Sequence, residues 1–375
     1  MKSVHIWVPM LGGEGGIQTF SNFFVKALVE CGYGEIFIFS KNNSSKQLKK
    51  SNPFIKSLGF SQIPPFLRTL IFSIFIFVCA IKLRPKLIVV TLVNFAPVAA
   101  VIKLFFNIPY VVVAHGMEVW KIRKILLKTA LKSADKVLSV SCYTQNKMIA
   151  QNIISADKAS VFSNTYDEHT FYYSGNKNLE IRKKYGLEEH DLLLLSVSRL
   201  CAAEKYKGHE IVMNAIVKLK PETPRLFYMV VGDGDYRGEL EQKAIQLGVG
   251  DRVIFSGRVL AEDLPAYYRT ADIFVMPSKG EGFGVVFLEA MGCGKPVIAG
   301  NQDGSVDALR RGELGVLVNP ESANDVAAAI SSVIDKTYPL PILYRPEELS
   351  GKVKEYFGFE SFKNRLKLVL EPWSK

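Results

Sequence analysis

The sequence predicts an α/β protein made of two facing Rossmann-like domains, each with a parallel β-sheet. Short runs of β-branched and aliphatic residues alternate with helical stretches, which is typical of βαβ units. A polar stretch at 165–187 interrupts this alternation, and the same pattern then starts again. The length of 375 residues suits two domains of ordinary size. We therefore expect ligands beyond the carboxyl ends of the strands and in a cleft between the domains.

The first domain is predicted at 1–170 and the second at 171–355. In the first, a strand at 3–10 leads through a glycine-rich loop into a helix at 16–32, and further strands are expected at 35–40, 86–93, 110–116 and 136–141. Strands of the second domain are expected at 192–199, 225–234, 252–257, 272–278, 295–300 and 315–320. A C-terminal helix at about 356–375 is expected to pack back on the first domain.

The composition fits a globular protein of a reducing compartment. Hydrophobic residues make up 48% of the chain, which is ample for two cores. The five cysteines are scattered and form no C-x-x-C pair, which argues against a disulfide framework or a zinc site. The first apolar run is too short, and too soon rich in glycine, for a signal peptide. We expect a cytoplasmic protein.

Charge is unevenly distributed along the chain. Residues 1–175 hold 20 Lys and Arg against 8 Asp and Glu, a net charge of +12; the remainder holds 27 against 28, a net of −1, which gives the +11 of the whole chain. No acidic residue occurs between Glu35 and Glu118. A basic half joined to a neutral half predicts an anionic partner for the first domain alone, either nucleic acid or anionic lipid.

An apolar segment at 66–81 lies inside this basic region, after the lysine-rich stretch 46–56. Its uninterrupted part, Leu70–Ile81, has 12 residues, whereas a membrane-spanning helix needs about 20. It is either a helix buried against the sheet or a helix lying in a membrane interface. No recognition helix or zinc knuckle indicates a nucleic-acid binder. Anionic lipid at the inner face of the membrane is therefore the expected partner, and nucleic acid is not.

Gly15 and Gly16 follow the first strand and open the first helix. Glycine there lets the backbone and the helix N-terminus approach a phosphate; a plain tight turn is the alternative. The dinucleotide fingerprint fails, because Gln18 takes the place of its last glycine and no acid follows the second strand. A Rossmann dehydrogenase is therefore disfavoured.

Three cations stand near the start of the second domain. Arg199 ends a strand, and Lys205 and Lys207 precede the next helix. An arginine fork and a lysine point charge are suited to a diphosphate, although a solvated turn explains the same spacing.

Two further features have a structural and a functional interpretation each. The pair Asp233 and Asp235 is better explained by a turn that Asp235 uses to cap a helix than by a metal site. His115 ends a strand of the first domain, on the edge where a ligand is expected, and it is either structural or functional.

The stretch EGFGVVFLE, Glu281–Glu289, sets two glutamates eight positions apart. Glu281 falls in a glycine-rich loop after a strand, and Glu289 falls in the following helix. A carboxylate only accepts hydrogen bonds, so pairs of sugar hydroxyls suit it, while the loop backbone can wrap a sugar or a phosphate. Helix capping by one glutamate and a surface position for the other is the structural alternative.

The chain resembles the retaining glycosyltransferases of family 4, which have the GT-B fold, over nearly its whole length. The strongest block is ADIFVMPSKGEGFGVVFLEAMGCGKPVIAG at 271–300, which is similar to the E-x7-E signature of that family. The glycine loop, HG, SRL…KG, GDG and DRVIFSGRV also match in order and spacing. One departure is Ser198, where glycine is usual.

This resemblance implies roles for the matching residues. Glu281 would meet the donor sugar, Glu289 the ribose hydroxyls, and His115 the sugar near its reacting carbon. Arg199 and Lys207 would clamp the diphosphate, and Lys207 matches better than Lys205 because it directly precedes the glycine. Further donor-binding positions are Gly15, Gly16, Lys205, Gly257, Arg258, Val259, Phe283, Gly284 and Val285.

The implied activity is transfer of a hexose-type sugar from a nucleoside diphosphate sugar to a saccharide acceptor, with retention. Front-face attack is expected, with the leaving phosphate helping to deprotonate the acceptor. No metal or other cofactor is expected, because Arg199, Lys207 and helix N-termini would stabilise the leaving phosphate. A lipid-linked acceptor in envelope, exopolysaccharide or O-antigen synthesis is expected. Two other functions stay open: a non-catalytic scaffold or binding subunit, and a nucleotide-sugar epimerase of the same fold.

Overall fold

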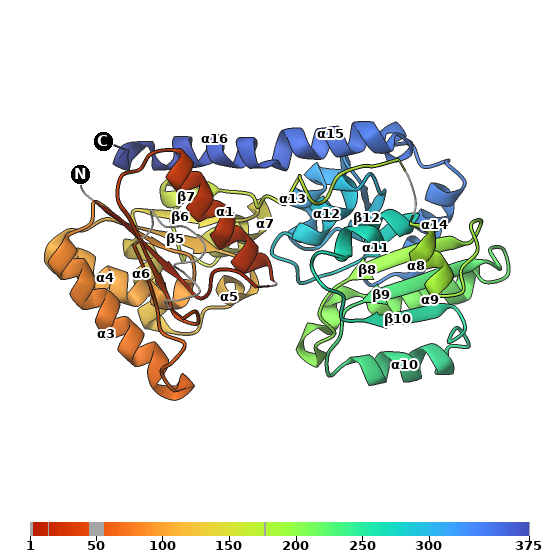
Figure 1. The fold of residues 1–375 in the computed structure, drawn as a ribbon, viewed down its shortest axis with the longest axis horizontal. Coiled ribbons are helices and arrows are strands. Elements are labelled where there is room, and N and C mark those ends of the chain that lie inside the picture. Colours follow the sequence, from red (N-terminus) through yellow and green to blue (C-terminus); the bar gives the residue numbers. More distant parts are fainter. Residues whose placement is uncertain (1–2, 14, 45–55, 176–177, 375) are drawn as a thin grey trace. The chain divides into compact units, whose positions relative to one another are not determined.

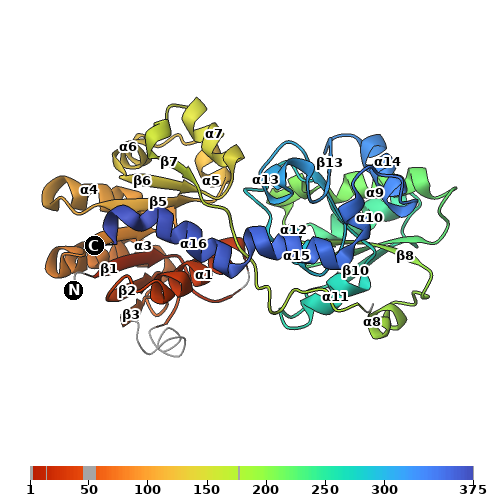
Figure 2. The ribbon, with the colours of Figure 1, turned by 90° about the horizontal axis from the view of Figure 1, so that it is seen from above.

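The computed structural model describes residues 3–13, 15–44, 56–175 and 178–374, which form two compact units. The first unit joins Met1–Thr165 to Phe359–Lys375, and the second is Tyr166–Gly358. Each unit holds a parallel sheet flanked by helices (Figure 1, Figure 2). The predicted α/β fold with two Rossmann-like domains is confirmed. Most of the lysine-rich stretch 46–56 lies outside the described residues.

The first sheet has the strand order β3-β2-β1-β4-β5-β6-β7, with all pairs parallel. The order reverses between β1 and β4, and in such sheets ligands bind outside the carboxyl ends at this switch point. The strands are β1 (Val4–Val8), β2 (Ile36–Ser40), β3 (Lys56–Gly59), β4 (Leu87–Val90), β5 (Tyr110–Ala114), β6 (Lys136–Ser139) and β7 (Ala159–Val161).

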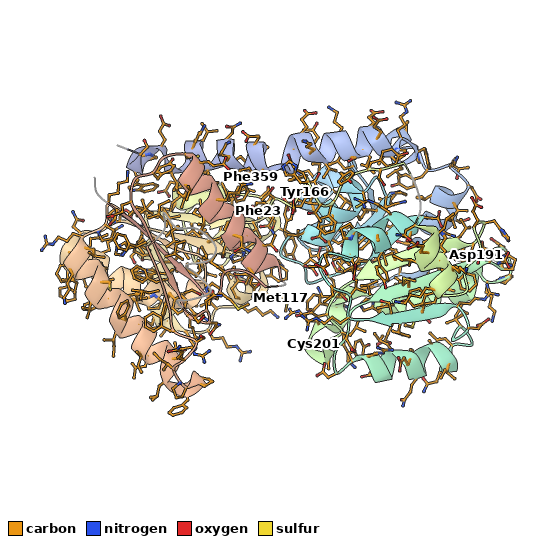
Figure 3. All side chains as sticks on the ribbon, viewed as in Figure 1. Phe23, Met117, Tyr166, Asp191, Cys201 and Phe359 are labelled. Atoms are coloured by element: carbon orange, nitrogen blue, oxygen red, sulfur yellow. The ribbon has the colours of Figure 1, made fainter. Side chains whose placement is uncertain are left out.

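Helices from both ends of the chain cover this sheet. On one face α1 (Gly16–Glu30) packs against α16 (Phe359–Leu370), where the rings of Phe23 and Phe359 lie 5.9 Å apart (Figure 3). On the other face lie α3 (Pro65–Leu83), α4 (Ala96–Phe106) and α6 (Ile125–Ser133). The shorter helices of this unit are η1 (Val93–Phe95), α5 (Met117–Trp120), α7 (Cys142–Ala150), η2 (Ala156–Lys158) and η6 (Glu371–Trp373).

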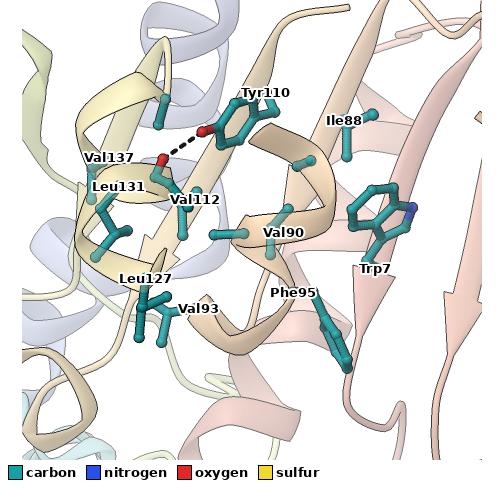
Figure 4. Packing of buried hydrophobic residues seen from close by; sticks show 14 of the residues in the cluster. Trp7, Ile88, Val90, Val93, Phe95, Tyr110, Val112, Leu127, Leu131 and Val137 are labelled. Carbon is teal, nitrogen blue, oxygen red and sulfur yellow. Dashed lines mark hydrogen bonds between the residues drawn. The ribbon is translucent and has the colours of Figure 1, made fainter. Parts of the chain in front are cut away.

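The core under α3, α4 and α6 is formed by the apolar runs that the sequence predicts as strands. Trp7, Val90 and Val112 point from three neighbouring strands toward this helix layer, and Leu127 and Leu131 of α6 pack on them (Figure 4). All five side chains are buried. Their burial supplies the apolar driving force that holds the layer on the sheet.

The second sheet repeats the same plan with the order β10-β9-β8-β11-β12-β13 and a switch point between β8 and β11. Its strands are β8 (Leu192–Val197), β9 (Leu226–Val231), β10 (Val253–Gly257), β11 (Ile273–Met276), β12 (Val297–Gly300) and β13 (Val316–Val318). Its helices are α8 (Leu179–Lys184), η3 (Ala202–Lys207), α9 (His209–Leu219), α10 (Arg237–Gln246), α11 (Leu264–Thr270), α12 (Val285–Gly292), α13 (Ser305–Ala308), η4 (Arg310–Gly312), α14 (Ala323–Ile334), η5 (Pro341–Tyr344) and α15 (Pro346–Phe357).

Helix α3 corrects two expectations from the sequence. It has 19 residues, so the 12-residue apolar run underestimates it, and among the described residues it is the one helix long and apolar enough to cross a membrane. Only Phe72, Ile76 and Ala80 are buried, while Phe66 is 81% exposed and others follow it. The alternative of a helix simply buried against the sheet is therefore wrong. One stripe docks α3 on the sheet, and the remaining apolar surface is exposed.

Candidate active site at the switch point of the second sheet

The predicted residues of the second unit gather where β8 and β11 end. The segment after β8 carries Arg199 and leads through η3 to Lys207. The loop after β11 carries Glu281 and leads into α12. Because β8 and β11 are adjacent and parallel, both segments leave the same edge of the sheet at its switch point.

Lys207 and Glu281 form an ion pair between these two segments. The ammonium group of Lys207 donates to the Glu281 carboxylate, and both side chains are largely shielded from solvent. Burial alone would lower the pKa of Lys207, but the Glu281 carboxylate and the neighbouring Tyr206 and Glu204 hold this pKa above its ordinary value. Lys207 therefore stays charged at neutral pH.

Glu204 connects the two predicted diphosphate-binding cations. The Arg199 guanidinium donates to one carboxylate oxygen, and the Lys207 Nζ lies 3.8 Å from the other. That second oxygen is buried and has no hydrogen-bond partner within the described residues. Glu204 was not predicted as a site residue, although it lies between Arg199 and Lys207 in the chain. A phosphate that binds to Arg199 would have to compete with the Glu204 carboxylate for the guanidinium group.

Lys205 points elsewhere. Its Nζ lies 2.6 Å from Glu239 of α10 and 4.5 Å from the centre of the Tyr236 ring. Of the two lysines, Lys207 is the one that the structure brings to Glu281.

The loop that carries Glu281 is held by the buried carboxylate of Asp303. Asp303 accepts from the Glu281 backbone N–H at 2.7 Å, from the Ser278 hydroxyl at 2.7 Å and from the Ser305 N–H at 2.9 Å. Burial raises the pKa of Asp303, against these hydrogen bonds, which lower it. A side chain at Gly304 would bring its Cβ to 2.0 Å from the Gly282 carbonyl, so the two loops touch through their backbones. Asp303 was not predicted as a site residue.

Phe283, Gly284 and Val285 form the turn into α12. Gly284 has a φ of 88°, and a Cβ there would lie 2.3 Å from the ring of Phe287. Phe283 is buried against Phe357, with ring centres 5.6 Å apart. Val285 is the first residue of α12, whose N-terminal N–H groups and positive dipole end suit an anion.

Glu289 lies inside α12, as predicted, in a different environment from Glu281. The Tyr268 hydroxyl donates to its carboxylate at 2.7 Å. Burial raises the pKa of Glu289 to about 7, although this hydrogen bond lowers it, and the Asp167 carboxylate raises it further. The N-cap of α12 is Gly284 and no side chain caps it. Neither glutamate is therefore a helix cap, and the structural alternative for this motif is wrong.

The segment Gly257–Val259 begins at the last residue of β10, where Gly257 has a φ of 74° and its carbonyl accepts from the Gly232 N–H at 3.0 Å. Asp235 does not cap α10 as expected, because the N-cap is Tyr236 and has no side-chain bond. Asp235 instead accepts from the Ala202 N–H at 2.8 Å and so fixes the start of η3.

Across the described ranges, no cluster of three or more His, Cys, Asp and Glu is placed to hold a metal ion.

In the first unit, His115 follows β5 and its Nε2 lies 3.0 Å from the Thr91 carbonyl, just beyond β4. A carbonyl only accepts, so Nε2 carries the proton and Nδ1 is left as an acceptor. Burial lowers the pKa of His115, against the effects of Glu118 and Thr91, and the ring is neutral at pH 7. The backbone N–H of His115 donates to the carboxylate of Glu118 at 2.5 Å.

Gly15 is the N-cap of α1, beyond β1 at the same switch point. Its φ is 136°, and a Cβ there would lie 2.6 Å from Oε1 of Gln18, whereas a Cβ on Gly16 would meet open space. Of these two positions, only position 15 therefore requires glycine for its backbone conformation. Together with His115 it lies at the carboxyl edge of the first sheet.

Family models match both units. The model described as Glycosyltransferase Family 4 matches residues 14–169, and the model described as Glycosyl transferases group 1 matches residues 177–345. The two sheets and the E-x7-E site are those of a GT-B glycosyltransferase fold. The chain belongs to the family 4 glycosyltransferases.

Relatives of described activity match part of the chain. A GDP-mannose-dependent alpha-(1-6)-phosphatidylinositol monomannoside mannosyltransferase of Mycolicibacterium smegmatis is 30% identical over 232 residues, 59% of this chain and 59% of its own length. The alpha-monoglucosyldiacylglycerol synthase of Streptococcus pneumoniae is 31% identical over 179 residues, 48% of this chain and 40% of its own length. The chain thus matches less than two thirds of the length of these relatives.

Solved structures match nearly the whole fold. HepE of Anabaena, in complex with UDP, has a TM-score of 0.79 at 22% identity and covers 99% of this chain and 100% of its own. Sucrose-phosphate synthase of Thermosynechococcus elongatus has a TM-score of 0.81 at 22% identity, with 99% of each chain covered. At this level of identity the likeness shows the fold alone.

Proposed function

We propose that this protein transfers a hexose-type sugar from a nucleoside diphosphate sugar to a saccharide acceptor, with retention and without a metal ion. The observation that carries the proposal is the Lys207–Glu281 ion pair, joined through Glu204 to Arg199, at the switch point of the second sheet. These contacts link Arg199 and Lys207 to the carboxylate of Glu281, in the loop that leads to the N-terminus of α12.

Each group has a role in this proposal. Arg199 and Lys207 bind the diphosphate, and Lys207 stabilises the charge that grows on the leaving phosphate as the glycosidic bond breaks. Since two carboxylates already orient Lys207, little reorganisation is needed during the reaction. Glu281 accepts from a hydroxyl of the donor sugar and Glu289 accepts from the ribose hydroxyls. The acceptor hydroxyl attacks from the side of the leaving group, and the leaving phosphate takes its proton.

His115 of the first unit is proposed to contact the sugar near its reacting carbon, and Gly15 is proposed to face the diphosphate and the acceptor. The neutral His115 ring offers Nδ1 as an acceptor for a sugar hydroxyl, because its Nε2–H is used by Thr91. Gly257–Val259 are proposed to bind the base through the backbone.

A thermal-shift panel of UDP, GDP, ADP and their sugar derivatives, with and without EDTA, tests donor binding. A nucleotide at 100 times its Kd should stabilise the protein by about 2.7 kcal/mol. We expect one nucleotide series to raise the melting temperature with or without EDTA, and Lys207→Ala to abolish this shift. Lys279→Ala is the matched control, because Lys279 lies in the same loop and pairs with Glu321. No shift from any nucleotide, or a full shift in Lys207→Ala, would contradict the donor site.

The stereochemistry and the class of reaction are tested with the donor that binds. Transfer with retention predicts that an α-linked donor gives an α-linked product, which anomeric NMR couplings report. A β-linked product would overturn the retaining mechanism. Conversion of the donor to its epimer without any acceptor would instead support the epimerase function, and binding without turnover would support the scaffold.

We propose further that the acceptor is lipid-linked and that the first unit binds the inner face of the membrane. Helices α3, α4 and α6 leave an apolar surface exposed, which consists of Phe66, Leu70, Ile74, Leu104, Phe105, Ile125 and Leu126. Exposed cations flank it at Lys82, Arg84, Arg123 and Lys124. Apolar side chains that enter the acyl boundary, with cations at anionic headgroups, are the pattern of an interfacial binder.

Co-sedimentation with vesicles of phosphatidylglycerol and phosphatidylcholine tests this surface. Wild type should bind at low salt, and Leu70→Glu with Ile74→Glu should weaken binding at least tenfold, because two inserted side chains are lost. Leu368→Glu is the control, since Leu368 of α16 is 73% exposed and lies outside the apolar surface. Wild type that stays in the supernatant, or equal binding by the double variant, would contradict the proposal.

A further inference from the structure

A buried chain of hydroxyl groups and one imidazole ring lies behind the two cations of the second unit. The Ser198 hydroxyl lies 2.9 Å from Nε2 of His209, and Nδ1 of His209 lies 2.8 Å from the Tyr228 hydroxyl. The Tyr228 hydroxyl lies 2.7 Å from the Ser196 hydroxyl, which in turn donates to the Val275 carbonyl. We call Ser198, His209, Tyr228 and Ser196 the hydroxyl–imidazole relay.

The direction of every hydrogen bond in the relay follows from its last member. Ser196 donates its one proton to the Val275 carbonyl, so it accepts from Tyr228. Tyr228 has then used its proton and accepts from Nδ1–H of His209. Burial lowers the pKa of His209 to about 3, so the ring is neutral and its Nε2 accepts from Ser198. All donors and acceptors of the relay are paired in this one arrangement.

Two neighbouring members of the relay, Ser198 and His209, adjoin the two cations. Ser198 immediately precedes Arg199, and His209 follows Lys207 by two residues. Between Lys207 and His209, Gly208 has a φ of 83°, and a Cβ there would lie 2.4 Å from the Pro277 carbonyl, just after β11. The backbone at Gly208 is therefore packed tightly, and the imidazole ties the Arg199 segment to the Lys207 segment.

We infer that the hydroxyl–imidazole relay is a positioning device that sets Arg199 and Lys207 at the spacing a diphosphate requires. This inference rests on the proposed function of the two cations. It also accounts for Ser198, the position at which the sequence departs from the family pattern: its hydroxyl has a buried partner in His209. A merely structural role for these groups predicts a general loss of stability. A positioning role predicts a loss confined to the phosphate part of the ligand.

Calorimetric titration with UDP and uridine, with GDP and guanosine, and with ADP and adenosine distinguishes these roles. For Ser198→Ala and Tyr228→Phe we expect diphosphate affinity to fall about tenfold and nucleoside affinity to stay within twofold, as fits the loss of one buried hydrogen bond. Ser198→Thr, which keeps the hydroxyl, should restore the affinity. Tyr267→Phe is the matched control, because Tyr267 is a buried tyrosine of the same unit whose hydroxyl pairs with Tyr185.

The outcomes separate this inference from the proposed function. If wild type binds none of the three diphosphates more tightly than the matching nucleoside, the diphosphate site itself is absent and the proposed function fails. If wild type binds a diphosphate more tightly than the matching nucleoside, two results would overturn the positioning role. Either the relay variants bind as tightly as wild type, or they lose diphosphate and nucleoside affinity equally.

Discussion

At the scale of single residues, the two glutamates of one motif have different neighbours. The carboxylate of Glu281 pairs with the ammonium group of Lys207. Glu289 is half-buried beside the hydroxyl of Tyr268, and burial raises its pKa to about 7. Near neutral pH the carboxyl group of Glu289 therefore titrates.

The titration of Glu289 should appear in ligand binding. Ribose hydroxyls donate to the ionised carboxylate, so protonation weakens the complex. With a pKa of about 7, the affinity for a nucleoside should fall about tenfold from pH 8 to pH 6, and Glu289→Gln should bind weakly with no pH dependence. A nucleoside is the right probe, because a terminal phosphate titrates in the same range. A wild-type affinity that is constant over this range would contradict the role of Glu289.

His5 makes the first unit sensitive to acid. It lies on β1 beside the rings of Phe37 and Phe39, and within the described residues neither ring nitrogen has a hydrogen-bond partner. Burial lowers its pKa to about 4 from 6.5. Between these values the unfolded chain binds a proton that the folded chain does not, so the free energy of unfolding falls as pH is lowered, by about 3 kcal/mol in total.

Urea unfolding between pH 7 and pH 4 checks this expectation. His5→Leu removes the titrating group, so its stability should fall less over this range than that of wild type, by the same amount of about 3 kcal/mol. His190→Gln, at an exposed histidine, should follow the wild-type curve. Parallel pH curves for wild type and His5→Leu would show that His5 is not the cause.

At the scale of elements, the sequence predicts every strand except the two edge strands of the first sheet. The predicted strands are largely apolar runs, whereas β3 (KSLG) has only four residues and β7 (ASV) only three, too few for an apolar run to stand out. Such edge strands are defined by backbone pairing with a neighbour, which composition does not reveal. Helix α3 is apolar on all sides, so no periodicity in its sequence indicates which stripe is buried.

Site residues were predicted where they lie in one continuous motif, and they were missed where only the fold brings them to the site. Glu281 and Glu289 lie in one block, and both lie in the predicted elements. Asp303 binds the Glu281 backbone from 22 residues away, and such a hydrogen bond between distant segments leaves no periodic trace in a single sequence. Glu204 pairs with Arg199 and Lys207, which lie five residues before it and three residues after it, but no motif marks it.

The Asp303 bonds make the loop before α12 a testable element. Asp303→Asn keeps the volume but replaces one accepting oxygen by a donor that faces N–H and O–H groups. We expect a loss of about 1–3 kcal/mol in unfolding free energy and weaker binding of the donor sugar nucleotide. Urea unfolding and donor titration measure both quantities. Asp335→Asn, at an exposed position, should stay within about 0.5 kcal/mol of wild type. An Asp303→Asn protein equal to this control would show that the carboxylate does not hold the loop.

At the scale of the whole molecule, the first unit is completed by the last residues of the chain. Helix α16 returns to α1, and the ring of Phe362 lies 5.7 Å from Phe20 and 4.7 Å from Phe162. Lys363 also pairs with Glu30 at 3.0 Å. The chain therefore leaves the first unit after Thr165 and re-enters it at Phe359. Stability of the first unit therefore depends on a helix that follows the second unit in the sequence.

This dependence predicts a local effect of a C-terminal substitution. Phe362 is fully buried, so Phe362→Ala should cost the first unit about 3–5 kcal/mol, while Leu368→Ala on the exposed side of α16 should cost little. Hydrogen exchange resolved by peptide measures both units in one experiment. We expect faster exchange in β1, β4 and β5 and unchanged exchange in β8, β9 and β11, because Phe362 belongs to the first unit alone. Equal acceleration in both sheets would mean that the two units unfold as one, and no acceleration would mean that α16 is not part of the first core.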